Sequence, residues 1–165
     1  MNERVVVVNA GKMNYDHLLD FSVLSNDVQV YDDSTNAELI ERIQGATVVV
    51  TKEIPVGPEL LSQFPESVKL IVEAGTGYNN IDLDAARAKG ITVCNIPAYS
   101  TERVAHTAIM MLLNFASTMQ QQIGMLARGD RSNFTKHLQV PHTEVNGKTL
   151  GIIGAGHIGM AVVKV

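Results

Sequence analysis

Residues 69–94, KLIVEAGTGYNNIDLDAARAKGITVC, contain one complete strand–helix–strand unit. Residues 70–72 are an apolar run, and residues 69–72 predict a strand buried on both faces. Asp82 is a suitable N-cap for a helix, and Gly90 is a suitable signal for its end. Residues 91–94 then predict a second strand. Two strands joined by one helix are typical of a parallel sheet.

The same alternation of strands and helices extends back to the start of the chain. Runs of β-branched and other apolar residues predict three earlier strands, and the stretches between them predict helices. Five strands that alternate with helices predict an α/β fold whose first domain is a flavodoxin-like doubly wound parallel sheet. In such a sheet a ligand binds at the carboxyl ends of the strands. The earlier strands are expected at residues 5–8, 28–31 and 47–50, and the helices at residues 14–24, 36–44 and 59–64, with Ser34 or Thr35 as cap of the second helix.

The pattern changes after Pro97. Ser100 and Thr101 can cap a long helix, and residues 104–123 of this helix are apolar at most positions. A helix that is apolar almost all round is buried between two bodies, so we expect a junction between domains here. Beyond it, residues 128–147 are polar and are expected to form an irregular arm. The predicted division is residues 1–99 and residues 100–165.

Residues 154–159, GAGHIG, match the pattern G-x-G-x-x-G. An apolar run at residues 149–153, expected to be a buried strand, leads into the pattern, and a helix-like stretch follows it. Gly154 permits a tight turn, Gly156 leaves room for a pyrophosphate, and Gly159 lets the helix and the strand pack closely. This context favours a dinucleotide site over a plain turn, because free amides at a helix N-terminus bind phosphates. The expected cofactor contacts are Gly154, Gly156, His157, Ile158 and Gly159.

A second short glycine motif, Gly-Thr-Gly at residues 75–77, follows the predicted strand at 69–72. Two glycines around a small polar residue allow the backbone to approach an anion closely, although a plain tight turn is the alternative. Lys52 follows the strand at residues 47–50 and belongs to the same rim of the sheet. It could meet an anionic substrate there, although a solvated lysine is the commoner outcome.

Composition argues against several kinds of protein and site. The net charge is −4 and the basic residues do not cluster, so nucleic acid and anionic membranes are not expected partners. Cys94 is the only cysteine, which excludes an internal disulfide and a cysteine-based metal site. The histidines lack the spacing of a helical metal pair, so we predict no metal. No stretch predicts a signal peptide or a membrane span, and we expect a cytoplasmic protein.

Two blocks of the sequence resemble D-2-hydroxyacid dehydrogenases. Residues 69–107, from KLIVEAGTGYNNID to NIPAYSTERVAHT, are similar to the block that links the substrate domain of that family to its interdomain helix. Residues 145–159, VNGKTLGIIGAGHIG, resemble the start of the family's NAD-binding domain. The resemblance implies a substrate-binding domain at residues 1–99. Residues 100–165 would be the interdomain helix, the arm and the first strand–helix unit of a truncated Rossmann domain.

The resemblance also implies an activity. The protein would be an NAD-dependent oxidoreductase that interconverts a small 2-keto acid and a D-2-hydroxy acid, with hydroxypyruvate and glycerate favoured by the wording of the motifs. The choice between NAD and NADP remains open. The acidic residue that would bind the ribose is expected about 20 residues beyond the glycine turn, which is past residue 165. We expect a homodimer formed through residues 100–165. Substrate contacts are expected from Lys52, Gly75, Thr76 and Gly77, and further cofactor contacts from Thr76 and Val104.

No catalytic residue is assigned. In the family the catalytic Arg, Glu and His belong to the later part of the NAD-binding domain, so we expect this chain to be a fragment that is inactive alone. The alternative is a non-enzymatic, NAD-sensing binding or regulatory protein of the same fold family. A phosphorylated signalling receiver is rejected, because Thr51, Lys52 and Glu53 follow the third strand where a receiver needs an Asp.

Overall fold

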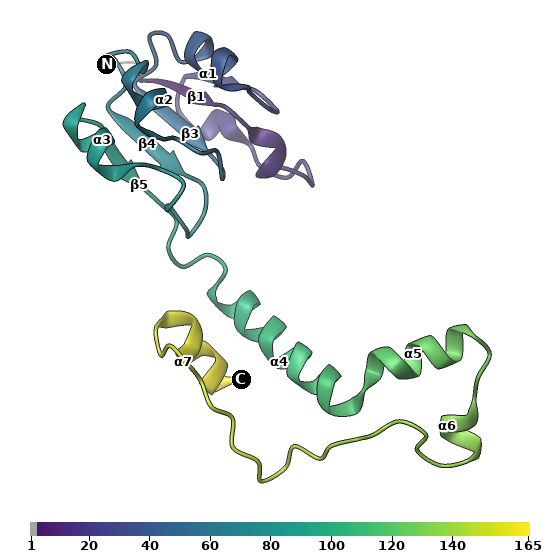
Figure 1. The fold of residues 1–165 in the computed structure, drawn as a ribbon. Helices are drawn as coiled ribbons and strands as arrows, with labels where there is room; N and C mark the ends of the chain where they lie inside the picture. Colours follow the sequence, from purple (N-terminus) through teal and green to yellow (C-terminus); the bar gives the residue numbers. More distant parts are fainter. Residues whose placement is uncertain (1–2) are drawn as a thin grey trace. The chain divides into compact units, whose positions relative to one another are not determined.

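A computed structural model describes residues 3–165, which form two compact units divided between Pro97 and Ala98. The first unit contains a five-stranded sheet in which all paired strands are parallel, in the order β2-β1-β3-β4-β5 (Figure 1). This is the strand order of flavodoxin-like folds, and it confirms the predicted α/β class. The assignment of substrate-binding and NAD-binding roles to the two parts stays a prediction. The strands are β1 (Arg4–Val7), β2 (Asp27–Val30), β3 (Val48–Thr51), β4 (Leu70–Glu73) and β5 (Thr92–Cys94).

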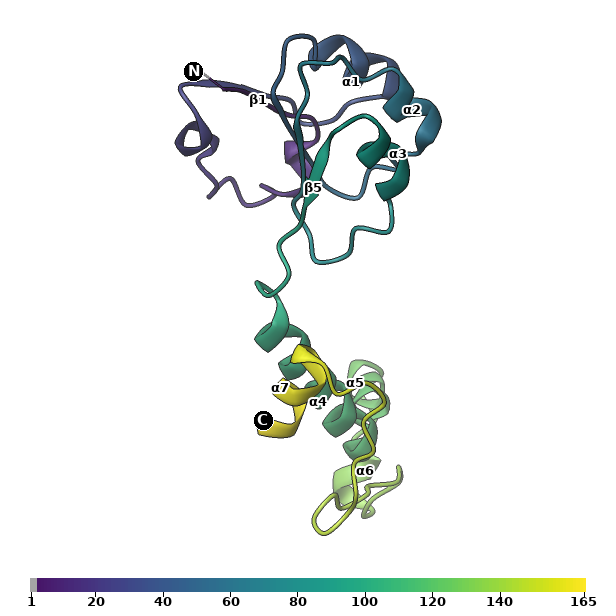
Figure 2. The same cartoon turned by 90° about the vertical axis from the view of Figure 1, so that its left-hand side faces the viewer.

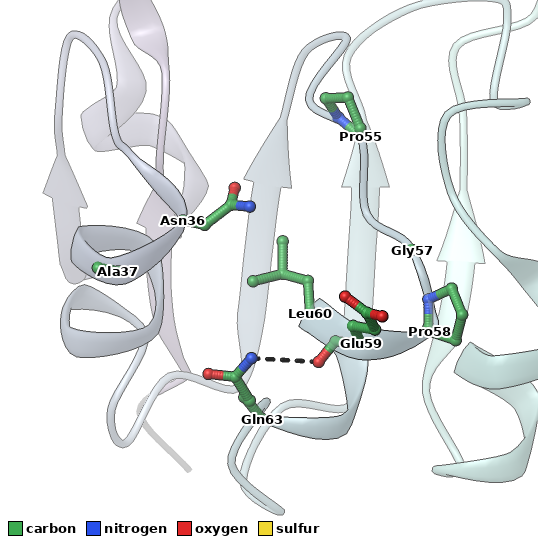
Figure 3. Close-up of a pocket in the computed structure, with 8 residues that line it drawn as sticks. All are labelled: Asn36, Ala37, Pro55, Gly57, Pro58, Glu59, Leu60 and Gln63. Atoms are coloured by element: carbon green, nitrogen blue, oxygen red, sulfur yellow. Dashed lines mark hydrogen bonds between the residues drawn. The ribbon is translucent and has the colours of Figure 1, made fainter.

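The sheet is covered differently on its two faces. Helices α1 (Asn36–Arg42), α2 (Pro58–Ser62) and α3 (Leu83–Ala88) lie together over one face (Figure 2). Their apolar residues pack against alternate residues of the strands, and Leu60 of α2 lies over the sheet (Figure 3). The other face packs on the connection between β1 and β2, which contains two short 3-10 turns, η1 (Ala10–Lys12) and η2 (Phe21–Leu24).

The prediction of a helix at residues 14–24 is wrong. The side chain of Asn14 accepts a hydrogen bond from the Leu19 amide at 2.8 Å and donates one to the Leu19 carbonyl at 3.2 Å. His17 lies in the left-handed region, with φ of 58°. The Asp20 carboxylate accepts from the Ser22 amide at 2.9 Å and caps η2. These local bonds between side chain and backbone compete with a helix and replace it.

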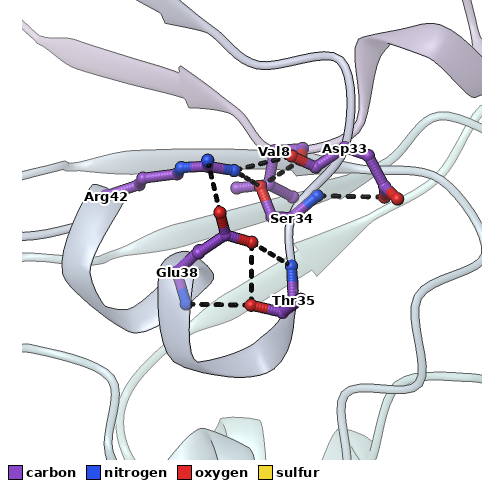
Figure 4. Close-up of polar contacts among 6 residues, drawn as sticks. All are labelled: Val8, Asp33, Ser34, Thr35, Glu38 and Arg42. Carbon is purple, nitrogen blue, oxygen red and sulfur yellow. Dashed lines mark hydrogen bonds and ion pairs between the residues drawn. The ribbon is translucent and has the colours of Figure 1, made fainter.

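Helix α1 begins with a complete capping box (Figure 4). The Thr35 amide donates to Glu38 Oε2 at 2.8 Å, and the Glu38 amide donates to Thr35 Oγ1 at 3.4 Å. Arg42 Nη1 donates to Ser34 Oγ and to the Asp33 carbonyl, both at 2.6 Å. Of the two predicted caps, Thr35 is therefore the N-cap, and the bonds of Arg42 fix the connection that leads into α1.

Glu38 gives this capping box a dependence on pH. Hydrogen bonds from the Thr35 amide and hydroxyl, together with the charge of Arg42, hold the pKa of Glu38 below its ordinary value of 4.5. A carboxyl whose pKa is lowered by folding stabilises the protein above its unfolded pKa, and this contribution is lost as the pH falls. Glu38→Gln is therefore expected to lower the thermal unfolding midpoint slightly near neutral pH, with a difference that shrinks below about pH 4.5.

Thermal melts of both proteins from neutral to acidic pH check this expectation. Glu41→Gln is the matched control, because it removes the same charge from α1 without touching the capping box. A deficit of Glu38→Gln that stayed constant over the whole pH range would contradict the role of the Glu38 charge.

The second unit is helical where it is regular. Its helices are α4 (Thr101–Ser117), α5 (Met119–Ala127), α6 (Ser132–Thr135) and α7 (His157–Lys164). The single helix expected over residues 104–123 is wrong, because Thr118 adopts a left-handed conformation with φ of 51° and separates α4 from α5. The Thr118 hydroxyl donates to the Pro141 carbonyl at 2.6 Å, which ties this break to the arm.

In α4 only Ala105 is buried and Phe115 is 82 % exposed, and burial of this helix between two domains stays a prediction. A further expectation for the second unit is wrong. Residues 149–153 form no strand, and Ile153 is fully exposed. A strand needs a neighbour for its backbone hydrogen bonds, and the described residues of this unit include no other strand. None of the helices within residues 3–165 is long and apolar enough to cross a membrane.

Candidate functional site

The carboxyl ends of β3 and β4 bring Lys52 and Gly75 together. Lys52 follows β3 directly, and Gly75 lies two residues after β4. A Cβ atom added to Gly75 would lie 3.0 Å from Lys52 Nζ and 3.2 Å from Glu73 Oε1. The absence of a side chain at position 75 therefore lets the lysine ammonium lie against the backbone of the loop, as a site for an anion requires.

The loop at residues 75–77 is held by hydrogen bonds to the segment after β5. The Ile96 amide donates to the Gly75 carbonyl at 2.9 Å. The Thr76 hydroxyl donates to the Ile96 carbonyl at 3.1 Å, and Asn95 Nδ2 donates to the Thr76 carbonyl at 2.8 Å. Within residues 3–165 the amides of Gly75, Thr76 and Gly77 donate no hydrogen bond. Three amide donors beside an ammonium suit a carboxylate.

Lys52 is not the solvated lysine that is commonest at such positions, since its side chain is only 17 % exposed. Its ammonium lies 3.4 Å from Glu53 Oε1. The buried side chain of Asn9 accepts a hydrogen bond from the Lys52 amide at 2.9 Å and donates one to the Lys52 carbonyl at 2.6 Å. The backbone of Lys52 is therefore fixed from the segment that follows β1 as well as from β3.

The sequence analysis missed Asn9, Glu73 and Asn80. Glu73 is the last residue of β4 and is fully buried. Its Oε1 accepts from the Glu53 amide, and its Oε2 accepts from Asn80 Nδ2, both at 3.0 Å. The one local signal was a glutamate at the end of an apolar run, because a carboxylate at a buried position needs a specific partner.

The glycine turn at residues 154–159 has the backbone geometry that its pattern predicts. Gly154 has φ of 96°, a conformation that favours glycine. Gly156 is the N-cap of α7, and the position of its missing side chain is open space. A Cβ atom on Gly159 would lie 2.0 Å from the Gly154 carbonyl oxygen, so only glycine fits there. Within residues 3–165 the amides of residues 157–159 donate no hydrogen bond, and they suit a pyrophosphate.

A hollow lies beside this turn, where α7 packs on the start of α4. Gly156 lines it, and Glu102, His157 and Lys164 supply the ionisable side chains of its wall. Val104, which was expected to contact the cofactor, is on α4 but is not among the lining residues. Of the expected cofactor contacts in this unit, Gly156 and His157 are therefore brought to one hollow.

A second hollow, between the start of α1 and α2, does not fit an organic anion (Figure 3). Glu59 is its only ionisable residue, and the hollow contains no cationic side chain. Gln63 Nε2 donates to the Glu59 carbonyl at 3.2 Å. The described residues also include no group of three or more His, Cys, Asp or Glu side chains placed to hold a metal ion.

Comparison with known proteins gives a consistent result. Residues 5–146 match the family model described as D-isomer specific 2-hydroxyacid dehydrogenase, catalytic domain. The D-3-phosphoglycerate dehydrogenase of Methanocaldococcus jannaschii is 38 % identical over 140 residues, which cover 84 % of this chain and 26 % of that protein. The glycerate dehydrogenase of Methylorubrum extorquens is 33 % identical over 132 residues, which cover 79 % of this chain and 42 % of that protein.

The solved structures agree with these relatives. The D-lactate dehydrogenase of Aquifex aeolicus, in complex with NAD and lactic acid, is similar with a TM-score of 0.77 at 27 % identity. The similarity covers 98 % of this chain and 47 % of that one, so the chain spans less than half of the length of the relatives named here. The family model covers most of the chain, including the sheet from residue 5 onward and the loop at residues 75–77. This chain belongs to the family of D-isomer specific 2-hydroxyacid dehydrogenases.

Proposed function

We propose that this chain supplies the substrate-carboxylate loop and the pyrophosphate turn of an NAD-dependent oxidoreductase that interconverts a small 2-keto acid and its D-2-hydroxy acid. The observation that carries the proposal is the row of three amides at Gly75, Thr76 and Gly77, which donate no hydrogen bond within residues 3–165 and begin at Gly75, beside Lys52 Nζ. Amide donors orient a planar carboxylate, and the ammonium adds an attraction that is strong at a partly buried position.

The favoured substrates are hydroxypyruvate and glycerate. Both carry one carboxylate, for which the rim offers three amides and the Lys52 ammonium, which itself lies 3.4 Å from Glu53 Oε1. The similarity to the glycerate dehydrogenase of Methylorubrum extorquens supports this choice. In the proposed arrangement the residues of this chain bind the carboxylate and orient the adjacent keto carbon, and none of them is assigned a proton transfer.

The residues of the second unit fit a dinucleotide. The open space beside Gly156 leaves room for a pyrophosphate, and the first three amides of α7 can donate to it. When bound, the nicotinamide supplies the chemistry by donating or accepting a hydride. Thr76 and Val104 remain proposed contacts of the cofactor, and NAD in preference to NADP remains part of the proposal. We expect the 165-residue chain to bind these ligands without turnover.

A homodimer formed through residues 100–165 is also proposed. Large apolar side chains of α4 and α5 are exposed, including Met110, Phe115 and Ile123. Apolar patches of this kind support association with a partner surface. A second copy of the same chain is the partner that we propose.

The experiment that tests the function is a titration of the 15N-labelled chain, followed by NMR. We expect hydroxypyruvate to shift the amide signals of residues 75–77 and NADH to shift those of residues 157–159. Lys52→Met should weaken hydroxypyruvate binding by about 10- to 100-fold, because a charge-assisted bond contributes about 1.5–3 kcal/mol. Lys69→Met is the matched control, since it removes the same charge from an exposed residue before β4.

The two ligands give separate outcomes. If hydroxypyruvate leaves residues 75–77 unchanged, the loop is not a carboxylate site and the proposed substrate class is wrong. If NADH leaves residues 157–159 unchanged, the glycine turn is a structural element and the cofactor proposal is wrong.

A further inference from the structure

We infer that Glu73 is a positioning residue for the substrate site: its buried carboxylate joins the loop that carries Lys52 to the loop that carries Gly75, and thereby sets where the ammonium lies. The inference rests on the proposed function, because it takes Lys52 and the amides of residues 75–77 as the groups that bind the substrate carboxylate.

Burial makes the carboxylate of Glu73 unusual. The residue has 0 % exposure, and a buried carboxylate costs a large desolvation energy unless hydrogen bonds compensate it. Both of its oxygens accept from N–H donors, Oε1 from the Glu53 amide and Oε2 from Asn80 Nδ2, each at 3.0 Å. The carboxylate is therefore held in one place, and the groups that hold it come from two different loops.

The two donors belong to the connections that form the site. Glu53 lies in the connection between β3 and α2, and Asn80 lies in the connection between β4 and α3. Asn80 Nδ2 also donates to the Ile54 carbonyl at 2.8 Å, and the Val56 amide donates to the Asn80 carbonyl at 2.7 Å. These bonds join the two connections to each other. The bonds of Glu73 are the part of this network that lies nearest to the Lys52 ammonium.

Glu73 also controls the backbone next to Lys52. Glu53 has φ of 58°, a left-handed conformation that is unfavourable for a residue with a side chain. The bond from its amide to Glu73 Oε1 stabilises this conformation, while Asn9 fixes the amide and carbonyl of Lys52. Glu73 Oε1 and Lys52 Nζ both lie close to the position that a Cβ atom of residue 75 would occupy. The negative charge of Glu73 is therefore close to the positive charge of Lys52.

Glu73→Gln would disturb this arrangement with little change in volume. The Glu53 amide and Asn80 Nδ2 both donate to the carboxylate, and a glutamine has only one acceptor oxygen. Its NH2 group must therefore face one of the two donors, so one of the ties between the loops breaks. The substitution also removes the charge beside Lys52.

A double-mutant cycle tests the inference on the 165-residue chain, with the dissociation constant of hydroxypyruvate read from the amide signals of residues 75–77. Glu73→Gln is expected to weaken binding about fivefold or more in the parent and to have no further effect in Lys52→Met, because it acts through the ammonium. Asn80→Ser removes the Nδ2 donor to Glu73 Oε2. It should likewise weaken hydroxypyruvate binding in the parent and have no further effect in Lys52→Met. Glu66→Gln, at an exposed glutamate before β4, is the matched control.

The outcomes separate the inference from the function on which it rests. If Glu73→Gln or Asn80→Ser weakens binding by the same factor with and without Lys52, Glu73 supports only the fold and the inference is overturned. Unchanged binding in Glu73→Gln overturns it as well. A parent chain that does not bind hydroxypyruvate overturns the proposed function itself, and this inference with it.

Discussion

Gly159→Ala is expected to weaken NADH binding by about 10- to 100-fold. The added Cβ atom would lie 2.0 Å from the carbonyl oxygen and 3.1 Å from the carbonyl carbon of Gly154. Both are backbone atoms, so no rotation of a side chain can relieve the overlap, and α7 must move away from the turn. The amides of residues 157–159 would move with it. Overpacking of this kind costs about 1–3 kcal/mol, and each 1.4 kcal/mol is tenfold in affinity.

Titration calorimetry with NADH measures the effect, and two further variants identify its cause. Gly151→Ala is the matched control, because its Cβ atom would meet no atom within 4 Å. Gly156→Ala also meets no atom within 4 Å, yet it should weaken binding because it fills the space proposed for the pyrophosphate. Binding by Gly159→Ala with the affinity of the parent would show that the turn does not hold the cofactor.

The strands of the first unit could be predicted from sequence to within a residue or two. Parallel strands that are buried on both faces are continuous apolar runs, and residues 5–8 and 70–72 are such runs. The neighbouring strands with which these strands pair were predicted from similar runs elsewhere in the chain. The strand order then follows from the way the helices connect the strands, which is why the fold class was accessible without a structure.

An equally apolar run at residues 149–153 does not form a strand, because its local signal says nothing about a partner. The helix predicted at residues 14–24 failed for the opposite reason, since the side chains of Asn14 and Asp20 bind the local backbone and replace helical bonds. Periodicity reports which residues prefer burial, and it does not report these competing hydrogen bonds.

Some residues of the candidate site could be predicted from the sequence and others could not. The loop at residues 75–77 and the turn at residues 154–159 were recognisable, because glycine spacing reflects a backbone requirement that is local in sequence. Asn9 and Glu73 were not recognisable. Asn9 binds the backbone of Lys52 across 43 positions, and Glu73 binds the amide of Glu53 across 20. Only the pairing of the strands brings these residues together.

Asn9→Ala is expected to lower the free energy of unfolding by about 2–4 kcal/mol. The side chain is fully buried, and its two bonds, at 2.6 and 2.9 Å, are to the carbonyl and amide of Lys52. An alanine leaves both partly buried backbone groups of Lys52 without these partners, and each unsatisfied group costs up to about 1–3 kcal/mol. Hydroxypyruvate binding should weaken too, because the backbone that carries the ammonium loses its support from the segment that follows β1.

Urea unfolding followed by circular dichroism measures the loss, and Asn14→Ala is the control that isolates burial. Asn14 makes the same pair of bonds, to the amide and carbonyl of Leu19, but these bonds are exposed. Water can replace them, so the control is expected to cost less than about 1 kcal/mol. Equal losses in the two variants would mean that burial adds nothing to the bonds of Asn9. A larger loss in Asn9→Ala, together with weaker hydroxypyruvate binding, would show that one buried amide supports both the sheet and the site at its edge.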